Sequence, residues 1–262
     1  MQELNSRTGF SKIYAIANQK GGVGKTTTCV NTAVCLAEAG AAVLLVDSDP
    51  QCNATHGLGV HDFADTCSVY DVFTNGASID SAIVATQVDQ LFLVPSTPDL
   101  AGAEVELPGR ERREFVLADA LATVKGNFDY IFIDCPPSLS LLTLNALVAA
   151  DKLIIPVQCE YYALEGLGQL LQTVELVRQG LNPGLQIAGL LMTMFDSRTR
   201  LSTQVVDEVR SHFPELTYRT VIPRNIRLSE APSFGKPISR YDPTCAGSDA
   251  YFDLATEVVE RE

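Results

Sequence analysis

A stretch rich in glycine and lysine stands near the N-terminus and reads Lys20-Gly21-Gly22-Val23-Gly24-Lys25-Thr26-Thr27. It follows a short apolar run over Ile13–Ala17, and a helical pattern begins at Thr26. The stretch departs from the pattern G-x-x-x-x-G-K-[ST] at the first glycine, because Gln19 stands there. Glycines let consecutive backbone N–H groups converge on phosphate oxygens, and the helix adds the positive end of its dipole. The whole stretch is therefore the predicted nucleotide site, with Lys25 reaching the β- and γ-phosphates and the Thr26 hydroxyl binding Mg²⁺.

Two later apolar runs end in carboxylates. Val43–Asp47 is followed by Ser48 and Asp49, and Tyr130–Asp134 ends in a single acid. Alternate residues of an extended strand face the same side, so Asp47 and Asp49 are expected to point together toward the phosphate end of the sheet. Open parallel sheets bind ligands at the carboxyl ends of their strands. Asp134 fits a Walker-B pattern and is expected to hold Mg²⁺ through a water molecule.

Strand and helix patterns alternate along the chain, which predicts an α/β fold with a mostly parallel, doubly wound sheet covered by helices on both faces. The predicted strands are Ile13–Ala17, Val43–Asp47, Leu91–Val94, Tyr130–Asp134, Leu153–Val157, Ile187–Met192 and a short one at Thr220–Ile222. The predicted helices are Thr26–Ala39, Arg113–Val124, Leu139–Ala149, Leu164–Gln179, Thr203–His212 and Asp249–Glu260. No repeat or linker interrupts them, so residues 1–262 are predicted to form one P-loop ATPase domain, with 1–11 a flexible tail. Residues 57–90 are expected to form loops and short helices.

Composition narrows the class of protein further. The chain has 262 residues, of which 46% are hydrophobic, and a formal net charge of −13. This apolar fraction supports a sizeable core and excludes disordered and fibrous classes. The longest apolar runs fall far short of the roughly 20 residues that a membrane helix needs. The N-terminus lacks the apolar core of a secretory signal, and the seven cysteines include no C-x-x-C pair, so we expect a cytoplasmic protein with reduced cysteines.

A second lysine, Lys20, precedes Lys25 by five residues. The pattern K-G-G-x-G-K-[ST] resembles the deviant Walker-A ATPases, P-loop NTPases that include the ParA/Soj partition proteins, MinD and the nitrogenase iron protein. The resemblance implies ATP and Mg²⁺ as cofactors. It also implies an ATP-dependent homodimer in which Lys20 contacts the partner's phosphates across the interface. In the same way, it assigns Asp49 to positioning or activating the attacking water and Asp47 to the outer magnesium shell. The iron–sulfur ligand of the nitrogenase protein is not expected at Cys135, because a shared four-cysteine cluster requires two cysteines from each subunit.

Within that family the chain is most similar to ParA/Soj partition ATPases. The strings that carry this similarity run through residues 47–55, 101–104, 156–166 and 222–232. The similarity implies that Pro223 packs on the adenine ring and that Asn225 hydrogen-bonds its edge. It also implies a ParB-like centromere-binding partner that stimulates hydrolysis.

Partition ATPases bind DNA without sequence specificity, and the charge distribution agrees with a basic face. Residues 196–240 carry eight basic and five acidic residues, a net charge of +3 against −16 for the remainder. The resemblance places Arg198 and Arg227 at DNA contacts, with Arg200 and Arg224 as neighbours. Phosphate contacts by such arginines give salt-sensitive binding with little base readout. The expected localisation is therefore nucleoid-associated.

Two other functions stay open at this level. One is a MinD- or ParA-like ATPase that positions a cargo other than DNA. The other is an ATP-dependent metabolic ligase of the dethiobiotin synthetase type, which shares the fold and would ignore DNA. Membrane attachment as in MinD is not expected, because the chain ends Glu257-Val258-Val259-Glu260-Arg261-Glu262, which an anionic surface would repel.

Overall fold

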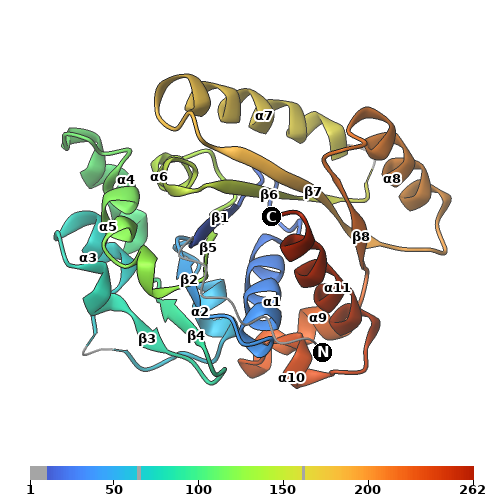
Figure 1. Ribbon diagram of the computed structural model, residues 1–262, viewed down its shortest axis with the longest axis horizontal. Coiled ribbons are helices and arrows are strands. Elements are labelled where there is room, and N and C mark those ends of the chain that lie inside the picture. Colours follow the sequence, from blue (N-terminus) through green and yellow to red (C-terminus); the bar gives the residue numbers. More distant parts are fainter. Residues whose placement is uncertain (1–10, 64–65, 161–162) are drawn as a thin grey trace.

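The computed structural model describes residues 11–63, 66–160 and 163–262 (Figure 1). The predicted tail, residues 1–11, lies outside the described residues except for Ser11. Tyr161 and Tyr162, which belong to one of the strings that carry the family resemblance, also lie outside them.

One eight-stranded sheet runs through the molecule in the order β3-β4-β2-β5-β1-β6-β7-β8. All neighbouring strands are parallel except β3, which is antiparallel to β4. The strands are β1 (Lys12–Ile16), β2 (Val43–Asp47), β3 (Val84–Ala85), β4 (Leu91–Val94), β5 (Tyr130–Asp134), β6 (Lys152–Gln158), β7 (Gln186–Phe195) and β8 (Thr217–Pro223). Since β1 lies in the middle while the chain winds outward on both sides of it, the predicted doubly wound α/β fold is confirmed.

Each central strand contributes to two cores, one on each face of the sheet. On β1, Ile13 and Ala15 belong to one core, whereas Tyr14 and Ile16 belong to the other. Successive side chains of a strand point to opposite faces, so a strand buried on both sides is apolar at every position. This explains the unbroken apolar runs in the sequence.

Helices cover both faces. The first core is closed by α3 (Val69–Thr74), α4 (Leu100–Glu106), α5 (Val116–Ala122), α6 (Leu141–Ala149), α7 (Ala163–Gly180) and α8 (Arg200–His212). The second is closed by α1 (Lys25–Glu38), α2 (Asn53–Gly57), α9 (Ile226–Glu230), α10 (Ile238–Tyr241) and α11 (Ala246–Glu260). In Figure 1, α7 and α8 lie above the sheet, and α1 and α11 lie side by side below it.

The predicted helices and strands are present with shifted ends, and the structure adds short elements. The short strand expected at Thr220–Ile222 is the longer β8, and the helix expected from Arg113 begins at Val116. Residues 57–90 contain α3, the 3₁₀ turn η1 (Ile79–Ala82) and β3, as expected for that irregular region. The sequence analysis missed α2, α4, α9 and α10, which are 4–7 residues long and too short to display a helical period. Within the described residues, no helix is both long and apolar enough to cross a membrane.

Candidate nucleotide-binding site

The glycine-rich stretch forms the turn between β1 and α1, at the carboxyl end of the central strand. Gly22 and Gly24 have φ angles of 72° and 87°, in the left-handed region that favours glycine. Gly24 is the N-cap of α1, so the backbone N–H groups of the first helical turn open into the loop. Thr193 of β7 supports the loop, because its hydroxyl donates to the carbonyl of Val23 at 2.9 Å. This is the backbone that a phosphate-binding turn requires.

Lys25 lies inside this turn. Its side chain is almost fully buried, and Nζ donates to the carbonyl oxygen of Lys20 at 3.1 Å. Burial lowers the pKa of Lys25, and the nearby acidic groups Asp134, Cys135 and Asp49 partly oppose that shift. The ammonium group is thus held in the loop near the carboxylates of Asp134, at the end of β5, and Asp49, in the segment after β2.

Asp134 ends β5 with a carboxyl group that the fold leaves poorly satisfied. Both of its oxygens are buried and neither accepts a hydrogen bond of normal geometry from a described residue, although the Thr26 hydroxyl and the Lys25 ammonium group lie close enough to act on its pKa. Burial, reinforced by the carboxylate of Asp47, raises the pKa of Asp134 well above its ordinary value. An unpaired buried carboxylate is costly, so native proteins keep one where a cation or ligand completes it. The neighbouring hydroxyl of Thr26 supplies a second oxygen, and hydroxyl and carboxylate oxygens suit Mg²⁺.

Asp47, on the adjacent strand β2, contrasts with Asp134, to which it is paired in register. Its Oδ2 accepts hydrogen bonds from the backbone N–H and the hydroxyl of Thr55 at 2.8 and 2.7 Å, and Oδ1 accepts from the N–H of Asp49 at 3.2 Å. Burial raises the pKa of Asp47 to about 6, although the Thr55 hydrogen bonds act in the opposite direction. Asp47 therefore fastens α2 to the end of β2.

Asp49 is nearly buried beside these groups. Its Oδ1 accepts from the N–H of Gln51 at 2.9 Å, and no hydrogen bond from a described residue reaches Oδ2. Cys52, three residues further on, has a φ of 57°, and Met194 of β7 has a φ of 52°. Two non-glycine residues in left-handed conformations thus flank the site, and such strain is concentrated at functional sites. Neither conformation could be recognised from the sequence.

A cavity of about 670 Å³ opens beside the loop. Its walls come from α1, α2, the ends of β7 and β8, α9 and the turn η4 (Ala231–Phe234). Pro223 and Asn225 both line it. The Oδ1 of Asn225 accepts from the N–H of Arg227 at 2.8 Å and caps α9, so Nδ2 is the amide group left to contact a base. Asn31 and Tyr251 also line the cavity, and no motif in the sequence pointed to them.

The side chain of Lys20 lies at the protein surface. Its Nζ forms an ion pair with Oε2 of Glu160 at 2.7 Å, and 41% of its side chain is exposed. Its backbone N–H donates to Oδ1 of Asn18 at 3.0 Å, and Nδ2 of Asn18 donates to the carbonyl of Pro156 at 2.7 Å. The backbone of Lys20 is therefore anchored, while its ammonium group lies at the surface.

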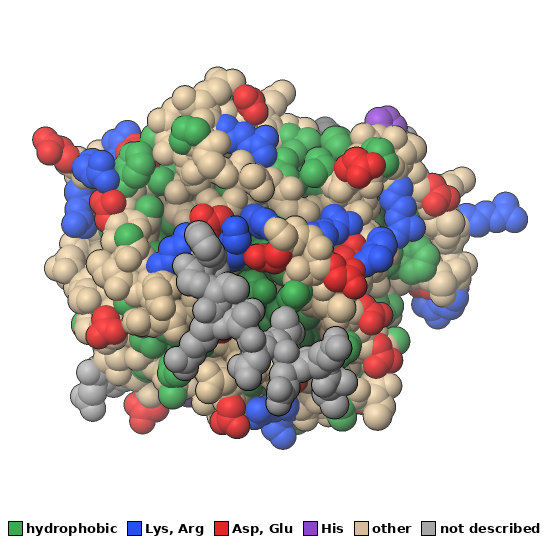
Figure 2. Space-filling view, viewed as in Figure 1, with side chains coloured by type: hydrophobic (Ala, Val, Ile, Leu, Met, Phe, Trp, Pro, Cys, Tyr) green, Lys and Arg blue, Asp and Glu red, His purple; other side chains and the backbone are tan. Residues whose placement is uncertain are grey.

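The four predicted DNA-contact arginines lie just after β7 and β8: Arg198 and Arg224 are in the two loops, and Arg200 and Arg227 are in the first turns of α8 and α9. The N–H of Arg224 donates to the carbonyl of Phe195 at 2.8 Å and joins the two loops. Hydrogen bonds from Arg198, with a further contribution from Arg224, lower the pKa of Asp196 to about 2. Arg227 pairs with two acids, whereas Arg200 and Arg224 form no ion pair with a described acidic residue. On the face shown in Figure 2, basic and acidic side chains are likewise intermixed.

Known proteins are similar to this chain. Residues 11–187 match the family model described as an AAA domain. The chain is 58% identical over 250 residues to the sporulation initiation inhibitor protein Soj of Bacillus subtilis, covering 95% of this chain and 99% of that protein. It is 53% identical over 251 residues to the chromosome partitioning protein ParA of Myxococcus xanthus, covering 96% and 89%. The chain belongs to the ParA/Soj family of chromosome-partitioning ATPases.

A solved structure agrees with this ParA/Soj assignment at the level of the cofactors. Cobyrinic acid a,c-diamide synthase of Mycobacterium smegmatis, with a bound ATP analogue and magnesium, is 40% identical with a TM-score of 0.83, covering 96% of this chain and 95% of that chain. The predicted family and its cofactors, ATP and Mg²⁺, are thereby confirmed. No cluster of three or more His, Cys, Asp or Glu that could hold a metal occurs in the described part of the chain. A magnesium site made of Thr26, Asp134 and nucleotide phosphates needs no such cluster.

Proposed function

We propose that this chain is a Mg²⁺-dependent ATPase of chromosome or plasmid segregation. Its ATP-bound sandwich dimer binds DNA without sequence specificity, associates with the nucleoid, and is released after hydrolysis stimulated by a ParB-like protein. The observation that carries the proposal is the phosphate turn with Lys25 buried in it and the unpartnered carboxylate of Asp134 beside it. The names of the relatives with more than half of their residues identical support the segregation role.

The residues of the turn divide the chemistry among them. The N–H groups of the turn and Lys25 would bind the phosphates, and Pro223 with Asn225 would hold the base. Thr26 and Asp134 would hold Mg²⁺, with Asp47 behind them. Bound Mg²⁺ neutralises part of the phosphate charge. Asp49, whose Oδ2 has no described partner, would orient or activate the attacking water.

Lys20 supports the dimer. Its ammonium group lies at the surface, and among the described residues its partner is one exposed carboxylate, an interaction worth about 0–1 kcal/mol. Lys20 can therefore leave Glu160 and contact the phosphates of the nucleotide bound to a second subunit with little loss of free energy. Loss of the γ-phosphate would remove the anion that Lys25 and the partner subunit's equivalent lysine contact together, and the dimer would separate.

DNA retention tests the segregation role. Wild type and Arg227→Glu are sedimented with nonspecific duplex DNA at two salt concentrations, with ATP, with ADP or without nucleotide. ATP-dependent and salt-sensitive retention is expected for the wild type and its loss for the variant, while ATP-dependent dimerisation is kept. Arg112→Glu is the control, because Arg112 is also exposed and ion-paired but lies in the loop before α5, where it pairs with Asp119. Unchanged retention by Arg227→Glu would reject this placement of the DNA face.

Three variants separate the steps of the nucleotide cycle. Lys25→Ala is expected to abolish nucleotide binding, Lys20→Ala to keep ATP binding but prevent dimers, and Asp49→Ala to trap a DNA-bound dimer. Normal hydrolysis by Asp49→Ala would contradict its role. If confirmed ATP-dependent dimers never retain DNA, a different cargo or a ligase reaction replaces the segregation role. A solved structure named as a synthase at 40% identity makes the ligase the first rival to assay, by small-acid-dependent ATP turnover.

A further inference from the structure

Two cations on the rim of the nucleotide cavity have no assigned role in the nucleotide site. Arg224 and Lys236 both line the cavity, and both are exposed. Neither forms an ion pair with a described acidic residue, whereas Arg198 and Arg227 are already paired with acids. Of the arginines and lysines that line the cavity, these two are therefore free to meet an anion at its mouth.

Backbone contacts fix both cations to the cavity wall. Arg224 is anchored through its N–H to Phe195. Lys236 follows Gly235, which has a φ of 60° and lies so close to the loop after α2 that a Cβ there would be 2.7 Å from the Cα of Gly59. The turn that carries Lys236 thus rests directly on that loop. Neither cation is on a free tail that could fold away from the mouth.

The nucleotide itself offers these cations no anion where they lie. Its phosphates are assigned to the turn with Lys25, and its base, which is uncharged, to Pro223 and Asn225 next to Arg224. An anion that meets Arg224 and Lys236 therefore comes from outside the cavity. Duplex DNA carries one negative charge per about 1.7 Å of helix axis, so a duplex that touches one of them presents phosphates to the other.

We infer that duplex DNA held by Arg224 and Lys236 lies across the mouth of the nucleotide cavity and slows the release of nucleotide. The inference rests on the proposed function, because it takes DNA as the ligand of the basic face. DNA then has two effects: it holds the protein on the nucleoid, and it keeps the nucleotide in place until hydrolysis separates the complex.

Release of a labelled nucleotide tests this inference. The wild type is loaded with a fluorescent, non-hydrolysable ATP analogue and Mg²⁺ and is chased with excess ATP, with and without nonspecific duplex. DNA is expected to slow release about fivefold or more. The double variant Arg224→Ala/Lys236→Ala is compared with Arg227→Ala at matched DNA occupancy, set by salt and measured by anisotropy of labelled duplex. Slowing is expected to persist in Arg227→Ala and to disappear in the double variant.

The other outcomes overturn the inference in distinguishable ways. Equal slowing in the two variants would show that DNA acts elsewhere and would leave the proposed function intact. Weaker binding of the analogue by the double variant without DNA would assign the two cations to the nucleotide instead. A wild type that retains no duplex with ATP would remove the proposed function together with the inference.

Discussion

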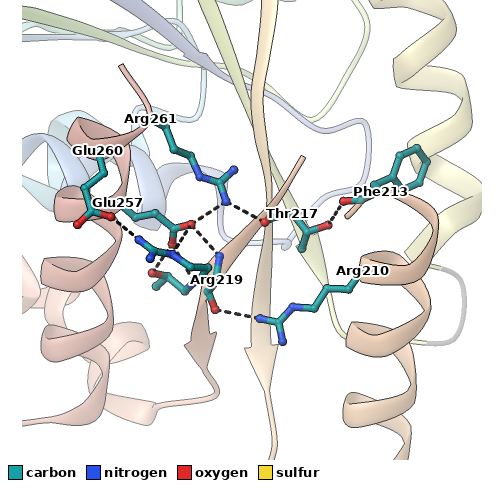
Figure 3. Close-up of polar contacts among 8 residues, drawn as sticks. Arg210, Phe213, Thr217, Arg219, Glu257, Glu260 and Arg261 are labelled. Atoms are coloured by element: carbon teal, nitrogen blue, oxygen red, sulfur yellow. Dashed lines mark hydrogen bonds and ion pairs between the residues drawn. The ribbon is translucent and has the colours of Figure 1, made fainter. Parts of the chain in front are cut away.

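Two buried carboxylates, one in the middle of the chain and one near its C-terminus, have opposite environments. Asp134, at the end of β5, has 0% of its surface exposed, and no described residue gives either oxygen a hydrogen bond. Glu257, on α11, is 2% exposed and accepts from the N–H groups of Arg219 and Thr220, from the Thr220 hydroxyl and from Nη2 of Arg261, at 2.7–2.9 Å (Figure 3).

The two environments shift the pKa values of the two carboxyl groups in opposite directions. Burial acts to raise the pKa of both, and at Asp134 nothing outweighs it. At Glu257 the hydrogen bonds outweigh burial, and the net pKa is lowered. A satisfied buried carboxylate stabilises the fold by fastening α11 to the edge strand β8. An unsatisfied one destabilises the empty protein and is expected where a ligand completes it.

The largest effect expected from this difference is on activity. Asp134→Asn should lower ATP hydrolysis about 100-fold or more, because a metal-holding carboxylate is lost. The free energy of unfolding without nucleotide should stay the same or rise, because a buried carboxyl group without well-formed hydrogen bonds is removed. Hydrolysis and urea unfolding are measured on the same preparation, with the exposed Asp89→Asn as control. A large loss of stability in Asp134→Asn would show that Asp134 is a structural group like Glu257.

Glu257 should behave in the reverse manner. Glu257→Ala should lower the free energy of unfolding by about 3 kcal/mol, because Arg261 and the edge of β8 lose their buried partner. ATP hydrolysis per folded molecule should not change. Glu260→Ala is the matched control, since Glu260 also pairs with Arg219 but is 55% exposed, and its cost should stay below about 1 kcal/mol. If Glu257→Ala and Glu260→Ala lower the free energy of unfolding by similar amounts in urea, the buried carboxylate stabilises the fold no more than the exposed one.

Relief of the strained backbone at Cys52, near the phosphate-binding end of the sheet, should change the free energy of unfolding by a smaller amount. Cys52 sits in a left-handed conformation directly after the Asp49 loop. Cys52→Gly should raise the free energy of unfolding by about 0.5–1 kcal/mol, because glycine adopts that conformation without a Cβ penalty. Cys52→Ala, which removes the thiol and keeps the Cβ, should give no gain in thermal or urea unfolding. Equal changes in the free energy of unfolding for Cys52→Gly and Cys52→Ala would show that the effect comes from removing the thiol and not from relieving the backbone.

The smallest expected effect is a pH dependence at the satisfied carboxylate. The folded-state pKa of Glu257 lies below the ordinary value of 4.5, so its contribution to stability is complete above that value and is lost as pH falls through the folded-state pKa. The stability difference between wild type and Glu257→Gln should therefore be constant from about pH 7 to about pH 5 and shrink at lower pH. A pH series of urea unfolding curves measures it. A difference that grows on acidification would contradict the direction of the pKa shift.

Much of the fold could be predicted because its signals are local. The β1–turn–α1 unit follows from the glycines and lysines of one short stretch, and the strands follow from apolar runs. The short helices α2 and α9 could not be predicted, because they depend on distant groups. Thr55 of α2 is held by Asp47 and Asp49 is tied to Ser96, while Leu228 of α9 packs against Gly247.

The sequence by itself determined the phosphate turn, the acids at the strand ends and the family, because backbone conformation, residue period and motif spacing are properties of neighbouring residues. It did not separate Asp134 from Glu257 as kinds of buried carboxylate. That difference depends on which donors the fold brings to each oxygen. Glu257 meets Arg219 and Thr220 from a strand 37–38 residues away, whereas no described residue gives Asp134 a hydrogen bond of normal geometry. Hydrogen bonding is satisfied in three dimensions, so only the tertiary structure decided which acid braces the fold and which is left for a ligand.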